Sequence, residues 1–353
     1  MTPRLSPRRM AFAGVCGLVL ALAIGGAYLG LRDSGAASVT RTCNGSEGLC
    51  ALRLDEVALA TTHNSMNDAE DGFRYPSQER GIEAQLEDGV RGFLIDAFLG
   101  SPRMAGAEQI IYTDMTETML STAVKAVGDE PAQEALALRA RAGPPAADAP
   151  RDVYLCHQFC ELGAVLMSHE VEVLRRFLDE HPDAVVVVVI QDELAATELP
   201  PVLEDGGLDS YLATIDPTVP LPTLGSMVES GRRLVIGLEN GDLGPAIPNV
   251  YDGGLVQEVP YRFHSVQQLE EPSSCRPHRG HDDAPLFLLN HWVTPPSQEL
   301  AAQANAEDVL LARAERCSEQ RGQPVNLVAV DFYGSGDLLP TVADLNSQRS
   351  SAH

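Results

Sequence analysis

Two histidines follow short apolar segments and are the residues best suited to acid–base chemistry in this chain. His63 follows the predicted strand 57–62, and His157 ends the predicted strand 153–157. In such a pair, one imidazole takes a proton from an attacking hydroxyl and the other gives a proton to the leaving oxygen. Cleavage of a phosphodiester requires this transfer, so His63 and His157 are predicted to share one active site.

Oxygen-bearing side chains accompany the two histidines. Asn64 adjoins His63, Asp96 ends the predicted strand 90–96, and the cluster Gln191-Asp192-Glu193 follows the apolar run 184–190. Carboxylate and amide oxygens are hard donors, which favour Ca²⁺ or Mg²⁺ over zinc. A divalent cation would neutralise charge on a transferring phosphoryl group.

The elements that position these residues predict an α/β fold. The run 184–190 is almost purely Val and Ile, which is typical of a strand buried on both faces of a parallel sheet. Together with the preceding helical pattern at 168–181 and the strand 153–157, it predicts a βαβ unit. Several strands that each deliver a polar side chain at the C-terminal end predict a distorted (β/α) TIM barrel. We count seven strands, with 255–259 as a candidate eighth.

Further strand ends supply candidates for substrate binding. Glu239 and His291 each follow an apolar segment, so they are predicted to face the barrel mouth. Arg91 lies within the second strand and is a candidate for substrate binding or for a structural ion pair. Trp292, the sole tryptophan, is assigned to core packing in preference to stacking on a sugar ring.

The N-terminal 42 residues differ from the rest of the chain. Three arginines precede an apolar run of about 22 residues, from about 10 to 31, which predicts a signal peptide or an N-terminal membrane anchor followed by a stalk. Residues 43–353 are then one barrel domain outside the cytoplasm, secreted or anchored, with an insertion at about 100–150. Its six cysteines suit that location, and sequence proximity favours the disulfides Cys43–Cys50 and Cys156–Cys160, which leaves Cys275–Cys317.

Charge limits the partners of this domain. Fifty acidic residues oppose 25 basic ones, for a net charge of −25. This balance argues against nucleic acid as a partner and against strong docking on anionic lipid. Lys125 is the sole lysine, which makes a Schiff-base mechanism unsuitable. We expect a monomer that meets the membrane through the N-terminal segment.

Four motifs in order resemble the catalytic X region of phosphatidylinositol-specific phospholipase C, in particular the secreted bacterial and fungal members. They are Thr62-His-Asn-Ser65, Gly89-Val-Arg-Gly-Phe-Leu-Ile-Asp96, Leu155-Cys-His157 and the helix and valine run of 168–192. The segments 286–292 and 328–332 also resemble that group. The resemblance covers roughly residues 54–346, apart from the insertion.

The resemblance implies roles for individual residues. His63 would be the base, His157 the acid, and Asp331 the carboxylate that orients the first histidine. Asn64 and Asp96 would bind Ca²⁺. On the fourth strand Gln191, Asp192 or Glu193 could align with the ligand position, and Asp192 is chosen. Leu94 departs from the pattern, because an acidic residue is usual at its position. The implied reaction is attack of a head-group hydroxyl on phosphorus, with a diacylglycerol-like alcohol leaving and a cyclic phosphate forming.

Two alternatives stay open. A glycerophosphodiester phosphodiesterase or a sphingomyelinase-type barrel also pairs two histidines with acidic ligands, but would be expected to carry Glu-x-Asp on the second strand, where this chain has Leu94. A barrel without catalytic activity that binds glycans or partners at the envelope is the other alternative.

Overall fold

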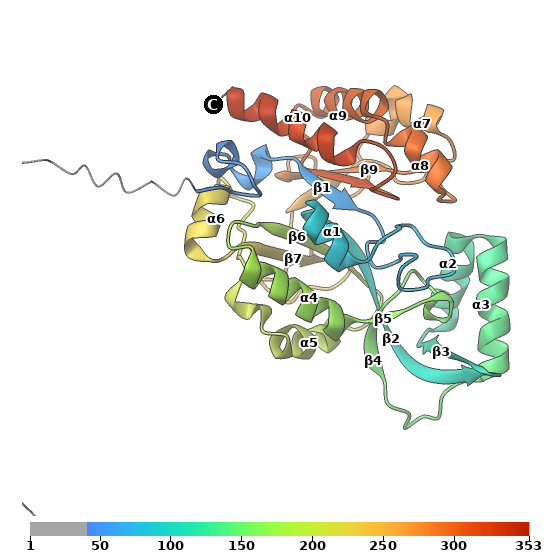
Figure 1. Cartoon of the computed structure of the whole chain (residues 1–353). Helices are drawn as coiled ribbons and strands as arrows, with labels where there is room; N and C mark the ends of the chain where they lie inside the picture. The colour runs from blue at the N-terminus through green and yellow to red at the C-terminus, as the bar shows by residue number, and fades with distance from the viewer. Residues whose placement is uncertain (1–40, 353) are drawn as a thin grey trace, which may run out of the picture. The chain divides into compact units, whose positions relative to one another are not determined.

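The computed structural model describes residues 41–352, and residues 40–353 cluster as one compact unit around a ten-stranded sheet (Figure 1). The predicted N-terminal signal or anchor segment lies outside the described residues. Within residues 41–352, none of the helices is both long enough and apolar enough to cross a membrane. The strands are β1 (Leu59–Thr62), β2 (Gly92–Ala105), β3 (Glu108–Thr113), β4 (Asp152–Leu155), β5 (Val165–Leu166), β6 (Val186–Asp192), β7 (Leu234–Leu238), β8 (Val256–Glu258), β9 (Leu286–His291) and β10 (Leu327–Val330).

Helices separate most of these strands and cover the sheet. In Figure 1, α4 and α5 lie on one side of the curled sheet, and α9 and α10 lie on the other. The α-helices are α1 (Ile82–Asp88), α2 (Glu117–Val127), α3 (Asp129–Ala142), α4 (Met167–Glu180), α5 (Leu199–Asp205), α6 (Leu224–Ser230), α7 (Val266–Glu270), α8 (Gln298–Ala304), α9 (Glu307–Arg321) and α10 (Leu338–Ser351). The 3₁₀ turns are Gly48–Ala51, Leu54–Glu56, Cys160–Leu162, Ala196–Glu198, Leu208–Ser210 and Pro272–Cys275.

The sheet confirms the predicted distorted barrel. Strands β8, β9, β10, β1, β2, β6 and β7 pair in that order, and every pair among them is parallel. The candidate eighth segment forms β8, and a single parallel bridge at Asn249 extends the pairing of β7. Because the strands are parallel, their C-terminal ends meet at one mouth.

The predicted βαβ unit at 153–190 is wrong in its first strand. β2 continues past Asp96 and leaves the barrel, and β4 runs antiparallel to this extension with Leu155 opposite Ala97. β4 is therefore not a barrel strand, and α4 connects back to β6, which pairs in parallel with β2. Since β4 runs back toward the barrel, its C-terminal end still arrives at the mouth.

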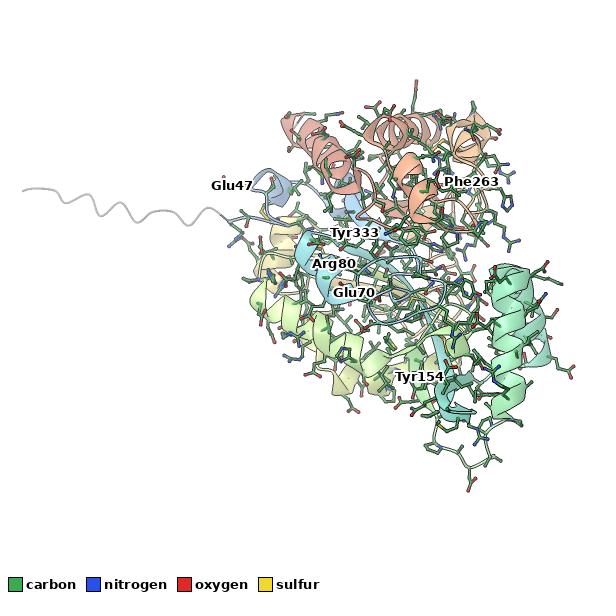
Figure 2. All side chains as sticks on the ribbon, turned by 45° about the vertical axis from the view of Figure 1, so that its right-hand side comes forward. Glu47, Glu70, Arg80, Tyr154, Phe263 and Tyr333 are labelled. Atoms are coloured by element: carbon green, nitrogen blue, oxygen red, sulfur yellow. A yellow bond between two sulfur atoms is a disulfide. The ribbon has the colours of Figure 1, made fainter. Side chains whose placement is uncertain are left out.

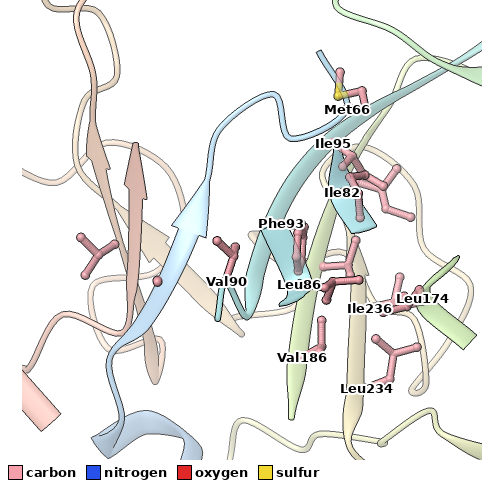
Figure 3. Close-up of a cluster of buried hydrophobic side chains, with 14 of the residues drawn as sticks. Met66, Ile82, Leu86, Val90, Phe93, Ile95, Leu174, Val186, Leu234 and Ile236 are labelled. Carbon is pink, nitrogen blue, oxygen red and sulfur yellow. The ribbon is translucent and has the colours of Figure 1, made fainter. Parts of the chain in front are cut away.

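Each barrel strand alternates its side chains between two cores. In β6, Val187 and Val189 face the interior of the barrel, whereas Val186, Val188 and Ile190 face the surrounding helices. Figure 3 shows the outer core, where side chains of the sheet meet those of the surrounding helices. This confirms the prediction that the valine run is buried on both faces.

The insertion forms a subdomain at the barrel mouth. β2 and β3 make an antiparallel hairpin, followed by α2 and α3, and all four elements lie within or next to the predicted insertion at about 100–150. In Figure 1 these helices lie beyond the ends of the barrel strands. The three predicted disulfides, Cys43–Cys50, Cys156–Cys160 and Cys275–Cys317, are all confirmed.

The loop between β1 and α1 is held by charged contacts at the surface and contains buried carboxyl groups. Arg80 and the Tyr333 hydroxyl both donate to Asp88, each at 2.6 Å, and Arg80 also lies 3.7 Å from Glu70 (Figure 2). Within residues 41–352, Asp68 Oδ2 in this loop and Glu170 Oε2 on α4 are buried without hydrogen-bond partners. Burial, followed by the neighbouring carboxylates, raises the pKa of Asp68 and of Glu170 to about 7.

These buried carboxyl groups predict that the fold loses stability as the pH rises from acid toward neutral. A folded-state pKa above the unfolded one means that the folded chain binds more protons, so stability falls as the pH rises from about 4 through 7. One pKa unit corresponds to about 1.4 kcal/mol, so the loss through Asp68 is on the order of 2 to 4 kcal/mol. Asp68→Asn keeps the acceptor for the Asp71 amide and is expected to unfold at higher urea concentration than wild type at pH 8, with a clearly smaller difference at pH 5. The exposed Asp209→Asn is the control, and equal shifts at both pH values would contradict the prediction.

Candidate active site

The register of β1 and β10 brings His63 and Asp331 together. Thr62 lies opposite Val330, so the residues that follow the two strands lie side by side. The His63 amide continues the ladder by donating to the Val330 carbonyl at 2.9 Å. His63 Nδ1 lies 2.8 Å from Asp331 Oδ1, which fixes one edge of the imidazole ring. Burial raises the pKa of the Asp331 carboxyl, and His63 opposes that shift.

His157 reaches the same cavity by a different route. The Cys156 amide donates to the Asp96 carbonyl at 3.2 Å, and the Cys156–Cys160 disulfide closes the turn that follows. The His157 ring is half-buried and lines a cavity of about 650 Å³ together with His63 and Asp331. Burial, and after it the charge of His63, lowers the pKa of His157 to about 3. The two imidazoles thus share one open cavity and interact electrostatically.

Trp292 packs against the first histidine. The indole and imidazole rings are stacked, with centroids 3.7 Å apart and planes 5° from parallel. Trp292 is buried and lines the cavity. The expectation that Trp292 serves in core packing was incomplete, because one face of its ring is part of the site.

Acidic side chains line part of the cavity. Asp96 and Glu193 line it, and Gln191 donates to Glu193 at 2.9 Å. Within residues 41–352, the carboxylate of Asp96 makes no hydrogen bond. Burial, followed by Glu239 and Glu193, raises its pKa well above the ordinary value.

The predicted metal-ligand set assembles only in part. Asn64 and Asp96 line the cavity, but Asp192 does not, because it lies on the outer face of β6 with Ile190. Its carboxylate accepts from the amides of Asn240 and Gly241, each at 2.8 Å. Leu94 faces the cavity without an oxygen to offer. The described residues contain no group of three His, Cys, Asp or Glu side chains arranged to hold a metal ion.

Two predicted substrate-binding residues lie outside the cavity. Arg91 sits on the outer face at the start of β2, donates to the Leu86 and Val90 carbonyls, and stacks over Phe177. It therefore makes neither a substrate contact nor the alternative ion pair within the described residues. His291 is fully buried, with Nε2 at 2.8 Å from the Ala304 carbonyl. Burial and Arg313 lower its pKa to about 3.

Glu239 does line the cavity and belongs to a cluster that the sequence did not reveal. Arg279 donates to both Glu239 oxygens, at 2.7 and 3.2 Å, and to Glu258 at 2.6 Å. The Tyr251 hydroxyl donates to Glu258 at 2.9 Å. Glu258 lies in the candidate eighth strand and Arg279 in no predicted strand, so only their pairing in space identifies the cluster.

Comparison with known proteins places the chain in a family. The PI-PLC X family, described as PI-PLC X 1, matches residues 136–346, which is more than half of the 353 residues. The chain belongs to the PI-PLC X family. The matched part includes His157, Glu239 and Asp331, and it begins after β1 and the hairpin of the insertion. Family membership agrees with the resemblance found in the sequence.

Individual relatives are distant. An uncharacterized secreted protein from Arthroderma benhamiae is 21% identical over 85% of this chain, which spans 62% of that relative's length. The phosphatidylinositol-specific phospholipase C from Listeria monocytogenes is 16% identical, with a TM-score of 0.47 over 85% of this chain and 97% of its own. A mutant of the enzyme from Staphylococcus aureus is 11% identical, with a TM-score of 0.49 over 85% and 97%. Both scores lie below 0.5, and we draw no conclusion from these two likenesses.

Proposed function

We propose that this PI-PLC X protein is a phosphoric diester hydrolase of the phospholipase C type that uses His63 and His157 for acid–base catalysis. The observation that carries the proposal is the placement of both imidazoles in one cavity, with His63 held by Asp331. The preferred substrate class is a lipid or head-group phosphodiester, in line with the PI-PLC X family.

His63 is proposed as the base. Its Nδ1 hydrogen is donated to Asp331, which leaves Nε2 as the acceptor for a proton from the attacking hydroxyl. As the hydroxyl oxygen bonds to phosphorus, the bond from phosphorus to the leaving oxygen breaks. The product is a cyclic phosphate that water can open in a second step.

His157 is proposed as the acid. With a pKa of about 3 its ring is neutral in the empty cavity at pH 7. A bound phosphodiester places a negative charge beside the ring, and a nearby opposite charge favours the protonated imidazole. The acid is therefore charged only when substrate is present, and it gives its proton to the leaving alkoxide.

No step of this mechanism passes through a metal ion, because the predicted ligand set of Asn64, Asp96 and Asp192 comes together only in part. The expected Ca²⁺, or Mg²⁺, is therefore tested directly by removing metal from the enzyme. Loss of turnover in EDTA would support the expected cation, and unchanged turnover would support catalysis by the two histidines without one.

The cellular setting is also proposed. Three disulfides suit an oxidising compartment, and the fungal relative is described as secreted, so we place the domain outside the cytoplasm. Attachment through the N-terminal segment and a monomeric state are retained as proposals. Multi-angle light scattering and fractionation of the full chain measure both.

The proposed function is tested by product analysis. The full chain is incubated with phosphatidylinositol in mixed micelles and with a soluble nitrophenyl ester of inositol phosphate, with and without EDTA. Release of cyclic inositol phosphate supports the proposal. Release of choline or glycerol from matched substrates would favour the alternative enzymes, against which Leu94 in the cavity counts, and absence of all turnover would favour a binding protein.

Two cations on the cavity wall are expected to assist capture of the anionic substrate. Lys125 on α2 and Arg262 after β8 line the cavity, and neither forms an ion pair within the described residues. Lys125→Ala and Arg262→Ala are each expected to raise KM about two- to fivefold at low salt, since exposed charge pairs contribute roughly 0.2–1 kcal/mol. The effect should shrink in 0.5 M NaCl. The exposed Arg141→Ala on α3 is the control, and equal KM values for all three variants would contradict the prediction.

A further inference from the structure

Three contacts in the described residues restrain the end of β9 that carries Trp292. The buried Arg313 donates to the Asn290 carbonyl at 2.7 Å and lies 3.1 Å from His291 Nδ1. The opposite nitrogen of His291 contacts the Ala304 carbonyl, so both edges of that ring are engaged. Strand alternation then turns Trp292, the next residue, toward the barrel interior. Its position is thus set by a buried network and not by the cavity itself.

Trp292, at this end of β9, contacts His63, the proposed catalytic base. The indole of Trp292 lies parallel to the His63 ring at 3.7 Å, while Asp331 holds the ring at Nδ1. A hydrogen bond at Nδ1 alone still allows the imidazole plane to rotate about the axis of that hydrogen bond. The parallel indole ring of Trp292 removes this freedom. Together the two contacts fix both the plane of the imidazole and the direction of Nε2.

We propose that Trp292 is a positioning residue that fixes the ring plane of His63 during turnover, an inference that rests on the proposed phosphodiesterase activity. Trp292 acts through His63 and takes no proton. Stacked aromatic pairs contribute roughly 0.5–1.5 kcal/mol beyond their buried area, so the expected effect on turnover is about three- to tenfold.

A matched pair of substitutions separates positioning from packing. Trp292→Phe keeps a flat ring against His63, and Trp292→Leu fills similar space without one. We expect Trp292→Leu to lower kcat about three- to tenfold with KM within twofold of wild type, and Trp292→Phe to retain most of kcat. Thermal unfolding confirms that both variants are folded at the assay temperature. Equal kcat values for the Phe and Leu variants would overturn the inference.

A double-mutant cycle gives a second readout that does not depend on how well the core accommodates the new side chain at position 292. If Trp292 acts through His63, Trp292→Leu lowers turnover of the nitrophenyl substrate in the wild type but causes no further loss in His63→Ala. Additive losses would refute the positioning role. Turnover by the wild-type enzyme is measured first, so a failure of the proposed function, seen as no turnover at all, is distinguished from a failure of this inference.

Discussion

His63→Ala and His157→Ala are each expected to lower turnover of phosphatidylinositol by about 10²–10⁴-fold, because each variant removes one proton transfer from the proposed mechanism. The two variants should differ with an activated substrate. Nitrophenolate leaves without receiving a proton, so His157→Ala is expected to regain most of its lost rate on the nitrophenyl ester. His63→Ala should stay impaired, since the attacking hydroxyl still needs a base.

The rescue pattern assigns the roles as well as testing them. Recovery of His63→Ala in place of His157→Ala would exchange base and acid, and recovery of neither would contradict acid catalysis by either ring. His264→Ala is the matched control, because this exposed histidine lines the same cavity and, among residues 41–352, its ring hydrogen-bonds only to the Thr294 carbonyl, at 3.1 Å. Its turnover should stay within threefold of wild type.

The sequence was sufficient to predict the barrel and the strand ends that carry His63 and Asp331. The valine run of β6 and the strand ends at His63 and Asp331 carry strong local patterns, and the pairing of β1 with β10 follows from the fold. The role of Asp331 was implied only by the family resemblance, and the 2.8 Å contact with His63 gives it a geometric basis. Its effect on turnover stays a prediction.

The errors among the site residues share one cause. Side chains alternate along a strand, so only every second residue can face the cavity. Asp192 follows the parity of Ile190 and His291 that of Leu289, both in the outer core, whereas Gln191 and Trp292 point inward. Because β6 and β9 are apolar on both faces, the sequence alone does not show which alternate side chains face the cavity.

Other features could not be read from local patterns. β4 looks like a barrel strand because its residues are buried, but it is buried against the extension of β2. The contact of Arg279 with Glu239 joins residues 40 positions apart across two loops. Such contacts depend on the path of the chain in space, which neither periodicity nor spacing specifies.

A buried ion pair helps to attach the insertion to the barrel. Arg139 on α3 donates to Glu161 at 2.5 Å and to the Thr113 carbonyl at 3.0 Å. The Glu161 side chain is fully buried and also accepts from the amide and hydroxyl of Thr113, at 2.9 and 2.8 Å. This network joins β3, α3 and the turn at 160–162, a few residues beyond His157. Burial raises the pKa of Glu161, and Arg139 opposes that shift.

Arg139→Met is therefore expected to destabilise the protein by about 3–5 kcal/mol, because it leaves the Glu161 carboxylate buried without its cation. Adding Glu161→Gln removes the uncompensated charge, so the double variant should be more stable than Arg139→Met alone. Urea unfolding measures both. Arg151→Met is the matched control, since the Arg151–Asp114 pair has a similar distance of 2.6 Å but about half-exposed side chains, and its loss should stay below about 1 kcal/mol. Equal destabilisation by the two methionine variants would show that the buried pair does not hold the insertion in place.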